Sequence, residues 1–81
     1  MLSPNETAML LSDLYTRLGF CLPPDAQEQL TEAPPSNVDG FTAAVFIAEG
    51  LDPSADRRLY REVKTMVADA FRRNEEREGN A

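Results

Sequence analysis

Four cations in the C-terminal third of this 81-residue chain have the type and spacing to bind an anion. At about 100° per residue along a helix, they fall within one narrow sector. They are Arg57, Arg61, Lys64 and Arg72. Such a stripe can bind carboxylate or phosphate groups. It can equally be a solvated face or pair with the chain's own acids, since exposed ion pairs contribute only about 0–1 kcal/mol each. Both interpretations stay open here.

Side chains for bond-making chemistry are scarce. The chain has no histidine, so the usual base at neutral pH and imidazole metal ligands are missing. Its single cysteine, Cys21, cannot form an internal disulfide or an all-cysteine zinc site, and no cation lies near it in sequence. We expect Cys21 to be a small, partly buried packing residue. We therefore expect no enzyme activity, no cofactor and no metal.

The segment from Asp52 to Asp56 resembles the start of a calcium-binding loop only in spacing. Asp52, Ser54 and Asp56 match the first three ligand positions of an EF-hand, but Arg57 stands where that loop needs glycine. An acid followed by Pro53 is typical of a helix start. We therefore expect Asp52 to cap a helix that begins at Pro53.

Apolar residues recur at helical spacing along most of the chain, and helices must therefore position the candidate residues. The sequence predicts an all-α fold: a small bundle of three main helices, at about 4–18, 37–49 and 53–73, plus one short helix at about 24–31. Residues 1–73 form a single domain in this interpretation. The apolar pattern ends after residue 73, and residues 74–81 are expected to be a disordered polar tail.

Local sequence signals mark where two of these helices begin and end. Residues 3–6 (Ser-Pro-Asn-Glu) and 36–39 (Ser-Asn-Val-Asp) have the form of capping boxes. Residues 19–20 and 50–51 each pair a glycine with a following apolar residue. This combination is typical of a helix end with the glycine in the left-handed conformation.

The helix expected at 37–49 is apolar nearly all round. Such a helix lies either in a core or in an interface, and a bundle this small has few helices with which to cover it. Together with the basic stripe, it supplies the candidate partner-binding residues. They are Phe41, Phe46, Ile47, Arg57, Arg61 and Lys64.

The net charge of −6 is unevenly distributed: residues 1–53 carry −7 and residues 54–81 carry +1. Nucleic acids and anionic membranes favour basic proteins, so neither is an expected partner. The chain has no apolar run of the roughly 20 residues that span a bilayer, and no signal peptide is readable. One cysteine is consistent with a reducing compartment, and we expect a cytoplasmic protein.

These features favour a non-catalytic protein–protein interaction module. Its partner would be another protein, or itself in a homodimer formed through the helices at 37–49 and 53–73. An acidic inhibitor that covers a basic enzyme surface, as small helical immunity proteins do, is an alternative supported by the charge of residues 1–53. A helix–turn–helix DNA regulator is the least favoured hypothesis, because acids surround the basic residues.

The chain also resembles acyl carrier proteins in outline, being small, acidic and four-helical, with a long loop between its first two main helices. The resemblance implies a carrier or ligand-binding protein. Such carriers hold a phosphopantetheine arm on the serine of an Asp-Ser-Leu motif, at the start of the helix after that loop. The matching residues here are Asp39, Gly40 and Phe41, and glycine has no hydroxyl to modify.

Overall fold

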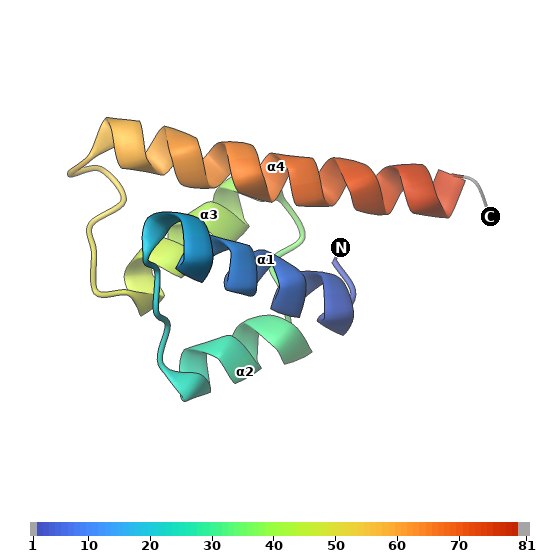
Figure 1. Cartoon of the computed structure of the whole chain (residues 1–81), viewed down its shortest axis with the longest axis horizontal. Helices are drawn as coiled ribbons and strands as arrows, with labels where there is room; N and C mark the ends of the chain where they lie inside the picture. The colour runs from blue at the N-terminus through green and yellow to red at the C-terminus, as the bar shows by residue number, and fades with distance from the viewer. Residues whose placement is uncertain (1, 80–81) are drawn as a thin grey trace.

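The computed structural model describes residues 2–79, with side chains described for residues 2–75. Its helices are α1 (Pro4–Leu18), α2 (Pro24–Glu32), α3 (Val38–Ala48) and α4 (Arg57–Gly79), and residues 2–79 contain no strand (Figure 1). The all-α class is therefore confirmed, with α2 as the short helix. Within the same residues, no helix is long and apolar enough to cross a membrane.

Helix α4 is the longest element and lies along one side of the bundle (Figure 1). It packs against both α1 and α3, whereas α2 packs against α1 on the side away from α4. Helices α1 and α4 run in opposite directions, so the start of α1 lies beside the C-terminal half of α4.

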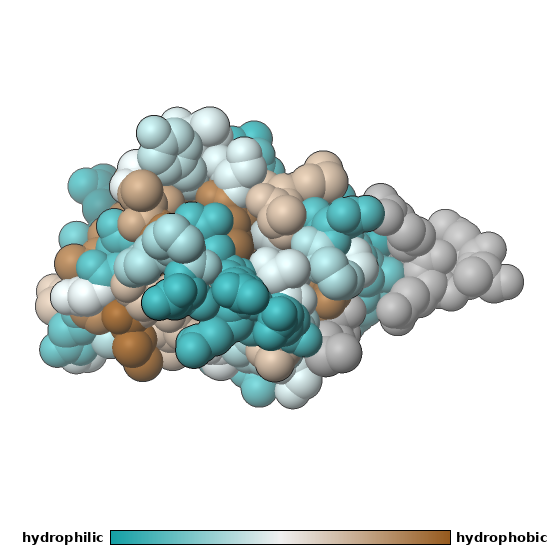
Figure 2. Space-filling view, turned by 90° about the horizontal axis from the view of Figure 1, so that it is seen from below, coloured by the Kyte–Doolittle hydropathy of each residue, from teal (hydrophilic) through white to brown (hydrophobic). Residues whose placement is uncertain are grey.

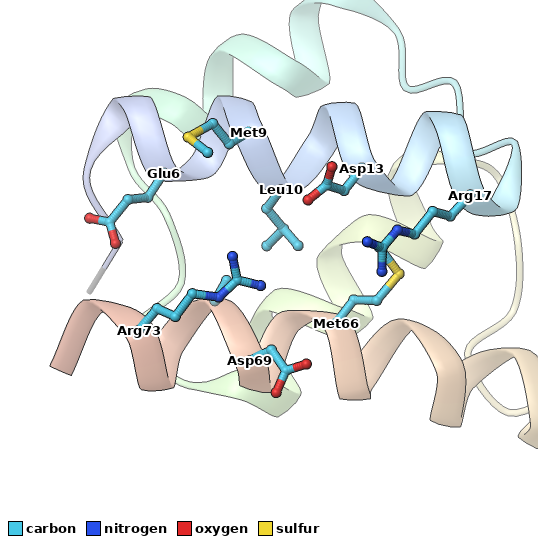
Figure 3. A pocket seen from close by; sticks show the side chains of 9 residues that line it. Glu6, Met9, Leu10, Asp13, Arg17, Met66, Asp69 and Arg73 are labelled. Carbon is cyan, nitrogen blue, oxygen red and sulfur yellow. The ribbon is translucent and has the colours of Figure 1, made fainter. Parts of the chain in front are cut away.

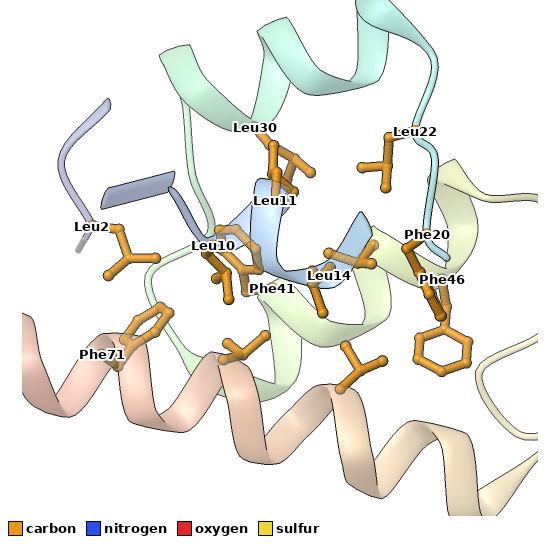
Figure 4. Packing of buried hydrophobic residues seen from close by; sticks show 13 residues of the cluster. Leu2, Leu10, Leu11, Leu14, Phe20, Leu22, Leu30, Phe41, Phe46 and Phe71 are labelled. Atoms are coloured by element: carbon orange, nitrogen blue, oxygen red, sulfur yellow. The ribbon is translucent and has the colours of Figure 1, made fainter. Parts of the chain in front are cut away.

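One hydrophobic core lies between the helices (Figure 4). Aromatic rings join its parts: Phe46 of α3 contacts Phe20 and Tyr60, each with ring centroids 5.5 Å apart. Such tilted and edge-on contacts favour aromatic pairs beyond their buried area. The buried apolar residues are Leu2, Leu10, Leu11, Leu14, Phe20, Leu22, Leu30, Phe41, Val45, Phe46, Val63, Val67 and Phe71.

The expected capping box of α1 is confirmed. Oγ of Ser3 accepts a hydrogen bond from the Glu6 amide (3.2 Å), and the Ser3 amide donates to Oε1 of Glu6 (3.3 Å). At the other end, Gly19 has φ 75° and the amide of buried Phe20 donates to the carbonyl of Leu14 (3.2 Å). The glycine-then-apolar signal therefore ends α1 as predicted.

The N-cap of helix α3 is Asn37 rather than Ser36, so the helix begins at Val38 and the cap of the box expected at residues 36–39 was placed one residue too early. Oδ1 of Asn37 accepts a hydrogen bond from the Gly40 amide over 2.6 Å, and this is an N-cap interaction. At its end Gly50 has φ 78°, as the sequence predicts. The Leu51 amide donates to the carbonyl of Phe46 (2.9 Å), as the Phe20 amide donates to Leu14 after α1, but the Leu51 side chain is exposed whereas that of Phe20 is buried.

The start of α4 differs from the prediction. The helix begins at Arg57, four residues later than expected, and its cap is Asp56, whose Oδ1 accepts from the Leu59 amide over 3.0 Å. The Tyr60 amide donates to the carbonyl of Asp56 (3.0 Å) and so closes the first turn.

Asp52 instead organises a separate turn before α4. Its Oδ1 accepts from the Ser54 amide (2.9 Å) and hydroxyl (2.7 Å), and its carbonyl accepts from the Ala55 amide (3.0 Å). An acid followed by proline suits the first two positions of a turn as well as a helix start. The sequence signal was therefore ambiguous, and the second acid takes the helix cap.

The end of α4 also differs. The helix continues to Gly79 through the first six residues of the expected polar tail, while residues 80–81 of that tail lie outside the described part. Asn74, the first of these six residues, is buried and donates to Oε1 of Glu6 over 2.8 Å. A polar contact thus replaces the apolar pattern that ends near residue 73.

Candidate functional site

Three of the four cations predicted to form a stripe meet at the start of α4. Arg57, Arg61 and Lys64 line a hollow of about 250 Å³ together with Tyr60 and with Pro53 of the preceding turn. Their spacing of three and four residues places them on one side of the helix, which is why they gather. We call this site the basic hollow.

Of the three cations in the basic hollow, Lys64 forms an ion pair with a described side chain. Its Nζ lies 2.9 Å from Oδ1 of Asp39 in the first turn of α3, and both side chains are partly exposed. The hydrogen bond to Asp39, aided by the attraction between the two charges, holds the pKa of the Lys64 ammonium above its ordinary value. The pair therefore ties α3 to α4 at one edge of the hollow.

Arg57 and Arg61 form no ion pair with any of the side chains described in residues 2–75, and both are exposed. The ring of Tyr60, which lines the same hollow, is half-buried against Phe46, so the core fixes its position. The hollow thus offers two guanidinium groups beside a fixed aromatic ring. Guanidinium groups bind carboxylate and phosphate with paired hydrogen bonds.

Neither Tyr60 nor Pro53 was among the candidate partner-binding residues predicted from the sequence. Tyr60 is three residues after Arg57 and four before Lys64, so helical spacing was the signal that could have found it. Arg72, the fourth cation, lies away from the hollow and pairs with Asp69 over 2.6 Å. The predicted stripe is therefore two separate features.

The apolar candidates on α3 lie elsewhere. Phe41 and Phe46 are fully buried, so they belong to the core and a surface partner does not reach their rings. Ile47 is 68% exposed but does not line the basic hollow. Periodicity could not separate these residues, because an all-round apolar helix has no polar face to mark its outer side.

Exposed apolar side chains are few. In the part of the chain that the structure describes, the large ones are Met9, Tyr15, Ile47 and Leu51. The face seen from the α2 side carries small apolar areas separated by hydrophilic ones (Figure 2). No broad apolar patch covers that face.

A second hollow lies between α1 and α4, where Asp13 and Arg17 of α1 and Arg73 of α4 reach toward the gap between the helices (Figure 3). Leu10 and Met66 also line it. It measures about 80 Å³, well below the roughly 300 Å³ at which small-molecule pockets begin. Its mixed charges also favour no particular ligand.

Groups suited to metal binding do not cluster: among the side chains described, those of residues 2–75, there is no set of three or more His, Cys, Asp or Glu placed to bind an ion. Asp52 and Asp56 use carboxylate oxygens to accept backbone hydrogen bonds, but the residue that caps α4 is Asp56, so the prediction that Asp52 caps a helix beginning at Pro53 was wrong. Cys21 is exposed, and the expectation that it is partly buried was wrong.

The position that matches the carrier-protein serine lies beside the cap of α3. A Cβ added to Gly40 would lie 3.0 Å from Oδ1 of Asn37, so a side chain here requires the cap to shift. Comparison with known proteins adds no assignment, because no protein-family model, curated protein or solved structure matches the chain. The functional inference therefore depends on the geometry of the site.

Proposed function

We propose that this protein is a non-catalytic protein–protein interaction module that binds an acidic segment of a partner in the basic hollow. The observation that carries the proposal is that Arg57 and Arg61 line one hollow with a fixed aromatic ring and have no ionic partner among the described side chains. Eight acids precede residue 54, so carboxylates are abundant in the chain. Two arginines with no such partner are available to a ligand.

The chemistry of the hollow defines the partner. Two guanidinium groups favour two carboxylates on the same segment, and the Tyr60 ring favours an adjacent apolar side chain or stacks with a guanidinium. The positive end of the α4 dipole adds to the attraction. The overall charge of −6 repels an acidic partner at a distance, so binding depends on contacts within the hollow and is modest in affinity.

A binding role also suits the chemistry of the rest of the chain. The chain lacks histidine, and its one thiol, Cys21, does not line the basic hollow. No nucleophile–base pair therefore faces a ligand bound there. An exposed free thiol suits a reducing compartment, which supports a cytoplasmic location as part of the same proposal.

Fluorescence anisotropy with a labelled peptide of glutamate and leucine tests the proposal. The variant Arg57→Glu/Arg61→Glu should bind at least about tenfold more weakly than the unchanged protein, because both paired hydrogen bonds become repulsive contacts. The matched control is Arg58→Glu/Arg72→Glu, which changes the net charge equally at exposed sites outside the hollow. An equal loss in both variants, or no binding by the unchanged protein, would contradict the proposal.

A further inference from the structure

Lys64 belongs both to the basic hollow and to a contact with α3. Its side chain lines the hollow, yet its Nζ lies 2.9 Å from Oδ1 of Asp39. Arg57 and Arg61 line the same hollow and form no ion pair with any side chain described in residues 2–75. A carboxylate of the chain itself therefore already forms the ion pair that an acidic group of a ligand would form with Lys64.

The fold holds Asp39 in this position. Asp39 lies in the first turn of α3, where the positive end of the helix dipole favours a carboxylate. The cap of that turn is Asn37, so the Asp39 carboxylate is left to pair with Lys64. Since α3 packs against α4, the two charges stay together in the folded chain, and an intramolecular group of this kind has an effective concentration on the order of millimolar. Asp39 therefore competes well with an acidic group on a dilute ligand.

The ion pair can nevertheless be exchanged. The side chains of Lys64 and Asp39 are 47% and 70% exposed, so water solvates both charges when the pair opens. The flexible stem of Lys64 lets its ammonium group turn from Asp39 toward a ligand. A ligand that binds Lys64 in this way replaces one exposed ion pair with another, and such a replacement gains little free energy. A third acidic group on a ligand is therefore almost neutral while Asp39 is present.

We propose that Asp39 is a specificity-determining residue that limits the basic hollow to partner segments with two acidic groups. Arg57 and Arg61 bind these two groups, whereas Lys64 stays with Asp39 and offers no new ion pair to a third. The inference rests on the proposed function and narrows its partner to a segment with two neighbouring acids rather than a long acidic run. Keeping one cation occupied lowers the affinity for densely acidic chains, and this discriminates against unwanted partners.

Fluorescence anisotropy with two labelled peptides of equal length tests this limit. One peptide carries three glutamates, and in the other the third glutamate is replaced by glutamine. The unchanged protein should bind the two peptides with affinities within about twofold of each other, because exposed ion pairs of similar strength are exchanged. Asp39→Asn should bind the three-glutamate peptide about three to five times more tightly than the two-glutamate peptide, because Lys64 then forms a new ion pair.

Two further variants separate this effect from overall charge. Glu62→Gln removes an exposed carboxylate of α4 outside the hollow and changes the net charge as Asp39→Asn does, so its affinity ratio should stay within about twofold. Asp39→Asn/Lys64→Gln lacks the cation that the third glutamate would bind, so its ratio should return to that of the unchanged protein.

The affinity ratio also distinguishes this inference from the proposed function. If the unchanged protein binds both peptides and Asp39→Asn leaves the ratio as it was, the role of Asp39 is overturned while the basic hollow remains the binding site. An equally raised ratio in Glu62→Gln, or a raised ratio that Lys64→Gln does not reduce, would overturn that role as well. Binding of neither peptide would contradict the proposed function itself, and this inference with it.

Discussion

Asn74 donates a hydrogen bond to Oε1 of Glu6 over 2.8 Å, and this contact joins positions 68 residues apart. The same oxygen accepts the Ser3 amide that closes the capping box of α1. One carboxylate therefore caps the first helix and holds the extended end of the last one. A hydrogen bond to a charged group contributes about 1.5–3 kcal/mol when it is shielded from water.

Asn74→Ala should lower the free energy of unfolding by about 1–3 kcal/mol, because it removes the donor and leaves the Glu6 carboxylate with one bond fewer. Urea denaturation followed by circular dichroism measures the loss. The neighbouring residue Glu75 is exposed, so Glu75→Gln should change the free energy by no more than about 0.5 kcal/mol. Equal effects would mean that Asn74 is not packed against α1.

The orientation of α3 predicts opposite results at two adjacent positions. Phe46→Ala should cost about 3–5 kcal/mol, because the ring is fully buried and contacts both Phe20 and Tyr60. Ile47→Ala removes an exposed side chain and should cost about 0.5 kcal/mol or less. The same denaturation measurement compares them, and similar losses would place Ile47 in an interface or in the core.

The start of α4 predicts which of two acids matters more to stability. Asp56→Ala should cost about 1 kcal/mol, because Asp56 caps the helix through the Leu59 amide. Asp52→Ala should cost less, because Asp52 organises only an exposed turn. Hydrogen exchange of the Leu59 amide measures the local effect. The reverse order would show that α4 begins at Pro53, as the sequence alone predicts.

Local sequence signals predicted most of the fold, whereas contacts between residues distant in sequence determined the parts that could not be predicted. The capping box at Ser3 and the terminator at Gly19 depend only on neighbouring residues, and both were predicted correctly. The burial of Asn74 on α4 involves a hydrogen bond to Glu6, which is distant from it in sequence. The choice between the capping acids of α4 depended on how the whole linker folds.

The candidate site likewise has one part that the sequence predicts and another that depends on tertiary packing. Helical spacing alone brought Arg57, Arg61 and Lys64 together, so the basic side of the hollow was predictable. The pairing of Lys64 with Asp39 depends on the packing of α3 against α4, which no local pattern specifies. The burial of Phe46 depends on that same packing.

The pKa of Lys64 should depend on Asp39. The pair holds the folded-state pKa above the ordinary value near 10.4, so its stabilising contribution is complete below that value and is lost as the pH rises through the folded-state pKa. Asp39→Asn should return the pKa of Lys64 toward the ordinary value, as measured by an NMR titration of the Lys64 side chain. Asp13→Asn, which changes a carboxylate on α1, is the control and should leave the titration unchanged.

Amide chemical-shift mapping with the glutamate–leucine peptide tests the central claim most directly, because it locates the contact on the protein. We predict that the amide shifts of residues 54–64 change as the peptide is added, with the largest changes around Arg57, Tyr60 and Arg61. The variant Arg57→Glu/Arg61→Glu should lose these changes while its other resonances stay in place. Changes confined to other parts of the chain, or none at all, would contradict a binding site in the basic hollow.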